Sequence, residues 1–317
     1  MRLSWQSAVR TELSHERVQS IMENAGESTK HASDGSERKA LRTELSRRSR
    51  MVLVVGLTAV GILVYTVAGY NYFMDSTTRL IVRVAVPLFL FLLVILLRNR
   101  VRAEYESLLF SFLGIAAGFL LAGTLGRLYT VTESVEGYAL AKVAEAVPIV
   151  VCMLLATRLE HYSFKKTGLT GGRVSVGLLL GLLVMPLALI QYVFSGGLQV
   201  TAQPLTVLGW LPWLVIFGVS NSLMEEIMFR GLFLQKLEPL LGKTGALGQT
   251  SMIFAVFHIA LLPFMGWAAT VIFVLFLFVH GCAWGYTMQR SDSIWGAVLA
   301  HAVADILFLI AIFGVGA

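Results

Sequence analysis

Ser222-Leu-Met-Glu-Glu-Ile-Met-Phe-Arg-Gly231 sets two adjacent carboxylates and an arginine inside an apolar run that is long enough to cross a bilayer. One charge at mid-membrane depth costs about 2.5–3.5 kcal/mol on insertion scales, so three together indicate a functional site rather than a charge cluster that only fixes helix packing. Glu226 and Arg230 lie four residues apart with the acid first, the favoured order for a helical ion pair. Glu225 points about 100° away from Glu226, so we expect it to remain available.

The whole chain has the composition of an integral membrane protein. Of its 317 residues, 56% are hydrophobic and only 14% are charged, whereas soluble domains carry about 25% charged residues. Successive apolar runs long enough to cross the lipid bilayer leave no room for a separate soluble enzyme domain. The net charge of +6 is explained by basic loops that orient the chain in a membrane, so we expect no nucleic-acid partner.

The hydropathy pattern predicts an all-α, polytopic transmembrane bundle of about nine spans, with eight as the alternative. The expected spans are 51–73, 80–97, 107–126, 138–157, 174–194, 205–234, 247–263, 267–288 and 294–315. Basic and non-basic loops alternate, and the basic ones are 98–106, 158–173, 235–246 and 289–293. Basic loops stay in the cytoplasm, which places the N-terminus there. In a bacterium the membrane would be the cytoplasmic (inner) membrane.

Further ionisable residues lie in the last three spans, at the depth of Glu225. They are His258 in Phe254-Ala-Val-Phe-His258, His280, and both ends of His301-Ala-Val-Ala-Asp305. At about 1.5 Å of rise per residue, all of these groups lie about 10–16 Å from the cytoplasmic ends of their helices. We therefore expect one polar layer, in which Asp305 shares a helix face with His301 and orients its imidazole. His280 has no motif around it and either packs or supports the layer.

Three other features of the spans predict packing. Lys142 and Glu145 in the fourth span are expected to form an ion pair that is structural or lines the same cavity. Gly281 and Gly285 form a small-xxx-small pair that permits close helix approach. Arg83, near the outer end of the second span, is expected to reach toward the membrane surface.

Peptide hydrolysis fits the polar layer. One free carboxylate with an imidazole can take a proton from a water that attacks a carbonyl carbon. A second imidazole can donate a hydrogen bond to the developing oxyanion, which is worth about 3–4 kcal/mol. The same groups would also suit zinc or another divalent metal with an open position, with Glu225, His258 and His301 as ligands. The sequence leaves both forms of water activation open.

The ordered set Glu225-Glu226-x-x-x-Arg230, Phe254-x-x-x-His258 and His301-x-x-x-Asp305 resembles the CAAX protease and bacteriocin-processing (CPBP/Abi) family of intramembrane endopeptidases. The resemblance implies that Glu225 activates water together with His258. It implies that Glu226 and Arg230 support the helix and the electrostatics of the site, and that His301 and Asp305 orient or stabilise the oxyanion. Family members are described as metalloproteases or as glutamate-dependent enzymes, so the cofactor is a divalent metal such as zinc, or none. Asp305 stands where the prenyl-protein branch typically has Asn, which points to the broader, mostly prokaryotic branch.

We therefore expect three parts in the chain: a polar, partly disordered cytoplasmic segment at 1–50, N-terminal transmembrane helices at 51–200, and a transmembrane catalytic core at 201–317 that holds the three motifs. The expected activity is hydrolysis of a peptide bond in a membrane-embedded or membrane-associated protein or peptide. Two alternatives remain. One is a proton- or cation-coupled transporter whose Glu/His/Asp layer relays ions, and the other is a non-catalytic immunity or scaffold member of the same family.

Overall fold

The computed structural model describes residues 47–71, 73–98, 100–126, 132–261 and 266–315. The predicted polar segment at 1–50 lies outside these residues except for its last four positions. The chain separates into two units, Met1–Ser49 and Arg50–Ala317, and the features discussed below belong to the second.

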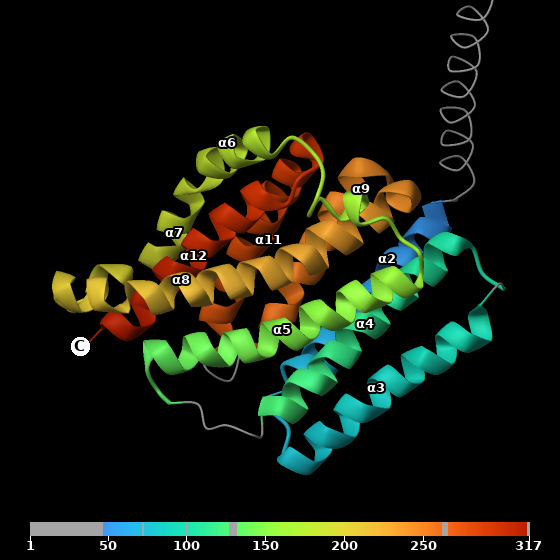
Figure 1. The fold of residues 1–317 in the computed structure, drawn as a ribbon, viewed down its shortest axis with the longest axis horizontal. Helices are drawn as coiled ribbons and strands as arrows, with labels where there is room; N and C mark the ends of the chain where they lie inside the picture. The colour runs from blue at the N-terminus through green and yellow to red at the C-terminus, as the bar shows by residue number, and fades with distance from the viewer. Residues whose placement is uncertain (1–46, 72, 99, 127–131, 262–265, 316–317) are drawn as a thin grey trace, which may run out of the picture. The chain divides into compact units, whose positions relative to one another are not determined.

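All regular structure in the described residues is helical, which confirms the predicted all-α class (Figure 1). The α-helices are α2 (Arg47–Gly61), α3 (Ser76–Leu97), α4 (Ala103–Leu125), α5 (Val135–Leu159), α6 (Val174–Val184), α7 (Pro186–Phe194), α8 (Pro204–Glu226), α9 (Gln235–Phe257), α11 (Trp267–Ser291) and α12 (Trp295–Gly314). Two π-helical segments, η1 (Ile62–Gly69) and η5 (Ile227–Leu234), continue α2 and α8. The short 3₁₀ segments are η3 (Phe164–Thr167), η4 (Gly197–Gln199) and η6 (His258–Leu261).

Eight helical stretches within the described ranges are long and apolar enough to cross a membrane, so this is an integral membrane protein. The longest, Pro204–Ala260, has 57 residues and would extend about 85 Å if straight, against a hydrocarbon core of about 30 Å. It is not straight, because Gly242 has φ 73° and ψ 169° inside α9. The Phe229 and Phe254 rings, on either side of Gly242, lie 5.2 Å apart, so the chain turns back on itself. The expected sixth and seventh spans thus lie on either side of this turn, within one of the eight candidate spans found in the described residues.

The predicted basic loops gather at one end of the bundle. The backbone N–H of Arg173 donates to the Ser291 carbonyl (2.7 Å), and the Gln289 side chain donates to the Lys243 carbonyl (2.9 Å). The opposite end of α12 lies with loop 195–203, because the N–H groups of Thr201 and Ala202 donate to the Gly314 carbonyl. The basic loops thus lie at one end and a non-basic loop lies at the other, as the alternation of basic and non-basic loops along the chain predicts. The assignment of the basic end to the cytoplasm remains a prediction.

Close helix approach through glycine occurs at several crossings, among them those of α11 with α9 and of α6 with α12. A Cβ on Gly281 would lie 3.0 Å from the Ser251 Cβ of α9, so the close approach predicted at Gly281 and Gly285 is confirmed. The tighter crossing joins α6 to α12, where a Cβ on Gly296 would lie 1.9 Å from the Gly177 carbonyl oxygen. Helix α8, which carries the acidic pair, packs against α5 and α12 in the middle of the bundle.

Arg83 contacts the end of the first candidate span. Its guanidinium donates to the carbonyls of Ala68 (3.2 Å) and Gly69 (2.9 Å), and its expected reach toward the membrane surface stays a prediction. These carbonyls end the π-helical segment η1 and need partners that the helix itself cannot supply. Arg83 thereby fixes the end of η1, directly before Tyr70.

Candidate active site

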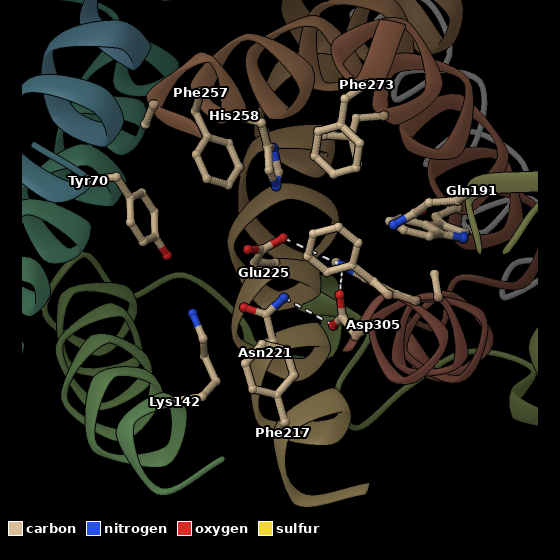
Figure 2. A pocket seen from close by; sticks show the side chains of 16 residues that line it. Tyr70, Lys142, Gln191, Phe217, Asn221, Glu225, Phe257, His258, Phe273 and Asp305 are labelled. Carbon is tan, nitrogen blue, oxygen red and sulfur yellow. Dashed lines mark hydrogen bonds and ion pairs between the residues drawn. The ribbon is translucent and has the colours of Figure 1, made fainter. Parts of the chain in front are cut away.

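The predicted polar layer surrounds a cavity of about 190 Å³. Glu225, His258, His301 and Asp305 all line it, although they come from three different helical segments (Figure 2). The depth argument therefore placed these four side chains correctly. His280 is buried but is not one of the residues that line this cavity.

Glu226 and Arg230 form the predicted ion pair, and both side chains are almost fully buried. Arg230 donates from one terminal nitrogen to Oε1 of Glu226 (2.8 Å) and from the other to the Gly281 carbonyl (3.3 Å). The guanidinium also lies 4.6 Å above the Phe254 ring, an attractive arrangement for a cation. The guanidinium and Oε1 of Glu226 therefore have partners that compensate their burial, whereas Oε2 of Glu226 has no hydrogen-bond partner among the described residues.

Glu226 also orients His301, a role that we expected for Asp305. Nδ1 of His301 lies 2.8 Å from the same Oε1 that accepts from Arg230. Because a carboxylate only accepts hydrogen bonds, Nδ1 carries a proton and donates it. Asp305 does share the helix face with His301, but its Oδ1 lies 3.7 Å from Nε2, beyond hydrogen-bond distance. Glu226 therefore makes the hydrogen bond at Nδ1, whereas Asp305 lies within ion-pair distance of Nε2, and its expected part in orienting the imidazole stays a prediction.

Glu225 is 4% exposed. Arg230 pairs with Glu226 and not with Glu225, as the positions of the two glutamates on the helix predicted. Its Oε2 has no hydrogen-bond partner among the described residues. The imidazole of His301 lies beside it, with 3.6 Å between Oε2 and Nε2. A buried carboxylate oxygen without a partner is uncommon and indicates a site for water or a ligand group.

His258 presents its second ring nitrogen to the cavity. Nδ1 lies 2.8 Å from the carbonyl of Phe254, one turn earlier in α9. A carbonyl only accepts, so Nδ1 donates and Nε2 of the neutral ring carries the lone pair. Figure 2 shows the His258 ring pointing toward the carboxylate of Glu225. The backbone carbonyl at position 254 thus sets the tautomer of His258, and the Phe254 ring packs against the imidazole with 5.1 Å between ring centroids.

Aromatic stacking fixes the His301 ring and accounts for His280. The rings of Trp284 and His301 are stacked with centroids 4.1 Å apart and an interplanar angle of 18°. His280 lies behind Trp284, at 5.1 Å between ring centroids, and its Nδ1 bonds to the Phe276 carbonyl. Of the two alternatives for His280, the structure therefore favours a supporting position behind the polar layer.

Several cavity residues were not identified as site residues from the sequence. Asn221 donates from Nδ2 to Oδ2 of Asp305 at 3.0 Å, and helical spacing could have found it, since it lies one turn before Glu225. Lys142 pairs with Glu145 at 2.6 Å and also lines the cavity, so both of the alternatives stated for it hold. Tyr70 and Gln191 line the cavity as well. No local pattern marks these two, because only the tertiary fold brings them to the site.

A preformed metal site is not evident in the described part of the chain. No group of three or more His, Cys, Asp or Glu side chains there is arranged to hold a metal ion. His301 and His258 each use Nδ1 within the protein, which leaves one nitrogen on each ring. Glu225, His258 and His301 therefore do not form a ready ligand set, and metal binding by them stays a prediction.

Comparison with known proteins identifies the segment that carries the three motifs. No curated protein and no solved structure shows a significant match to the chain. A family model described as type II CAAX prenyl endopeptidase Rce1-like matches residues 207–307, which lie within the expected core at 201–317. Residues 207–307 therefore form a domain of the Rce1-like family of type II CAAX prenyl endopeptidases, consistent with the CAAX protease and bacteriocin-processing family that the motifs resemble.

Proposed function

We propose that this protein is an intramembrane endopeptidase in which Glu225 and His258 activate the water that hydrolyses a peptide bond. The family match supports protease activity within a membrane. The observation that carries the assignment of Glu225 is its buried Oε2, which lacks a hydrogen-bond partner among the described residues and faces the cavity. A carboxylate in that position is suited to hold and deprotonate water.

The reaction begins with a water held between Oε2 of Glu225 and Nε2 of His258. Glu225 takes one proton as the water oxygen bonds to the carbonyl carbon, and the carbonyl oxygen becomes an oxyanion. The C–N bond then breaks, the oxyanion reverts to a carbonyl, and the departing amine takes the proton from Glu225. Glu225 is thus base and then acid, and the enzyme returns to its starting state.

His301 supplies positive character beside the oxyanion. Glu226 and Trp284 fix the ring, so Nε2 is held on the cavity side. In the imidazolium form of His301 both ring nitrogens carry a proton, and the proton on Nε2 can then be donated to the oxyanion; Nε2 also faces the carboxylates of Glu225 and Asp305. Preorganised donors of this kind act in the transition state because they need no reorganisation.

The cavity fits an apolar peptide segment. Its wall also includes Phe257, Phe273, Leu277 and Phe308, side chains that exclude water and favour apolar partners. We therefore propose a membrane-embedded or membrane-associated protein or peptide as substrate. The matching family is named for prenylated CAAX substrates, whereas Asp305 at the last motif position points to other peptides, so both belong in the test.

The test is a cleavage assay with the full chain in lipid nanodiscs. The probes are a prenylated CAAX peptide, the same peptide without the lipid, and an apolar transmembrane peptide, with products identified by mass spectrometry. Glu225→Ala and His258→Ala are each expected to lower cleavage by about 10²–10⁴-fold. Glu104→Ala removes a partly exposed glutamate outside the cavity and serves as the matched control. Full activity of Glu225→Ala would overturn the mechanism.

Metal content decides how the water is held. Cleavage by metal-free protein, lost in Glu225→Ala, makes Glu225 the general base. Stoichiometric metal with chelator-sensitive cleavage makes Glu225, His258 and His301 ligands of a metal-held water instead. If the wild type cleaves none of the probes but moves protons or cations across liposomes, the transporter alternative replaces the protease.

A further inference from the structure

The side chain of Asn221 occupies a distinctive position in the cavity. It lies on α8 one turn before Glu225, is 8% exposed, and lines the same cavity. Its Nδ2 donates to Oδ2 of Asp305, on α12, at 3.0 Å. Because an ionised carboxylate cannot donate, this contact fixes which end of the amide faces Asp305.

The proposed reaction needs hydrogen-bond donors where the oxyanion forms, and carboxylates cannot supply them. Glu225 and Asp305 line the cavity as acceptors in their ionised forms. Asn221 is a neutral donor beside them. Its amide nitrogen carries two hydrogens, and the bond to Asp305 uses one of them. In Figure 2 the Asn221 amide lies directly below the Glu225 carboxylate, and the His258 ring lies above that carboxylate.

We propose that Asn221 is a catalytic residue that donates its second Nδ2 hydrogen to the oxyanion, and that Asp305 is a positioning residue that holds the amide. This inference rests on the proposed peptidase function and assigns a donor within it. No bond is made or broken at Asn221, so the proton balance of the reaction is unchanged. His301 and Asn221 then face the oxyanion from α12 and α8.

The central test is Asn221→Leu, which keeps approximate size and removes the donor. We expect kcat to fall by about 10²–10³-fold, as for other single oxyanion donors. KM should change by less than about threefold, because the donor acts only in the transition state. Asn221→Ala, which avoids crowding, should give the same result if Asn221→Leu does not fold.

A transition-state analogue separates this role from a structural one. The probe is a phosphinic peptide of the cleaved sequence, whose tetrahedral oxygens imitate the oxyanion. Its Ki should rise in Asn221→Leu by about the factor by which kcat falls. Equal increases in Ki and in KM, or a kcat within about threefold of wild type, would overturn the proposal.

Two further variants complete the design. Asp305→Asn keeps an oxygen that accepts from the Asn221 amide, so kcat should fall less than about tenfold, and a loss as large as that of Asn221→Leu would overturn the positioning role. Gln249→Leu is the matched control. It removes a different buried amide, which bonds to Thr58 Oγ1 at 3.0 Å and does not line the cavity, and it should lower Tm without changing kcat.

The outcomes separate this inference from the proposed function. If the wild type cleaves, Glu225→Gln is inactive and Asn221→Leu is fully active, only this inference fails. If wild type cleaves no probe, the peptidase function fails with it.

Discussion

Glu226 connects the two helices that carry the site. A single oxygen, Oε1, accepts from Arg230 on the continuation of its own helix and from His301 on α12. The local half of this arrangement was predictable, because residues four apart on a helix meet. The interhelical half was not, because the two residues are 75 positions apart and only packing determines which nitrogen faces α8.

Replacing Arg230 should destabilise the fold strongly. Arg230→Met would leave the fully buried Glu226 carboxylate without its cation. Losing one partner of a buried pair costs about 3–5 kcal/mol, so the unfolding free energy in detergent should fall by that order. Arg230→Lys keeps the charge but not the forked donors, so a smaller loss is expected. An unchanged Tm for Arg230→Met would show that Glu226 does not depend on this pair.

The same reasoning explains which site residues the sequence identified. Glu225, His258 and His301 belong to charged or polar interruptions of apolar spans, which stand out in a hydropathy pattern. Asn221 lies one turn before Glu225, so helical spacing could have indicated it. Nothing local distinguishes Tyr70, whose part in the cavity follows from tertiary contacts alone.

At the scale of elements, a buried lysine ties α9 to α4 and to the end of α5. Nζ of Lys236 donates to the Ser107 carbonyl (3.1 Å) and to Ser111 Oγ (2.7 Å), and it pairs with Glu160. Burial raises the pKa of Glu160, and the Lys236 ammonium opposes that rise. The lysine therefore favours the ionised glutamate in the folded protein.

Removing this lysine should give a pH-dependent loss of stability. In Lys236→Met the folded-state pKa of Glu160 rises further above its ordinary value, because the cause that lowers it is gone. A raised carboxyl pKa makes the folded state bind more protons than the unfolded state, so stability falls as the pH rises above about 4.3. Thermal unfolding across pH 4–8 measures the deficit. The matched double variant Lys236→Met/Glu160→Gln should lose this pH dependence, and a pH-independent deficit in the single variant would contradict the account.

Helix boundaries were only partly predictable from the sequence. The apolar runs located the spans, and the Gly281/Gly285 spacing identified a real close approach. The π-helical segments η1 and η5 were not predicted, because a π-helix differs from an α-helix in hydrogen-bond register and not in hydropathy. The turn at Gly242 was expected as a loop, but the helix continues on both sides of it.

At the scale of the whole molecule, the cavity depends on more of the chain than the family match covers. Residues 207–307 supply Glu225, His258 and His301. Tyr70 and Lys142 come from earlier parts of the chain and complete the wall. The N-terminal transmembrane helices therefore help to build the site and do not only anchor it in the bilayer.

The orientation of the bundle gives a prediction at this scale. Lys165 belongs to the end where the basic loops gather, and Glu133 belongs to a loop of the other set. With Cys152 and Cys282 changed to Ala, Lys165→Cys should resist an impermeant maleimide in intact cells and react after permeabilisation. Glu133→Cys should react in intact cells. The reversed pattern would place the N-terminus outside and refute the cytoplasmic assignment.

The most direct measurement of the central claim compares wild type with Glu225→Gln, which keeps shape and removes the base. Both proteins are assayed in nanodiscs on one peptide that the wild type cleaves, at matched Tm and measured metal content. The account predicts that kcat falls by at least about 10²-fold while the protein remains folded. Cleavage by Glu225→Gln at the wild-type rate would contradict water activation by Glu225.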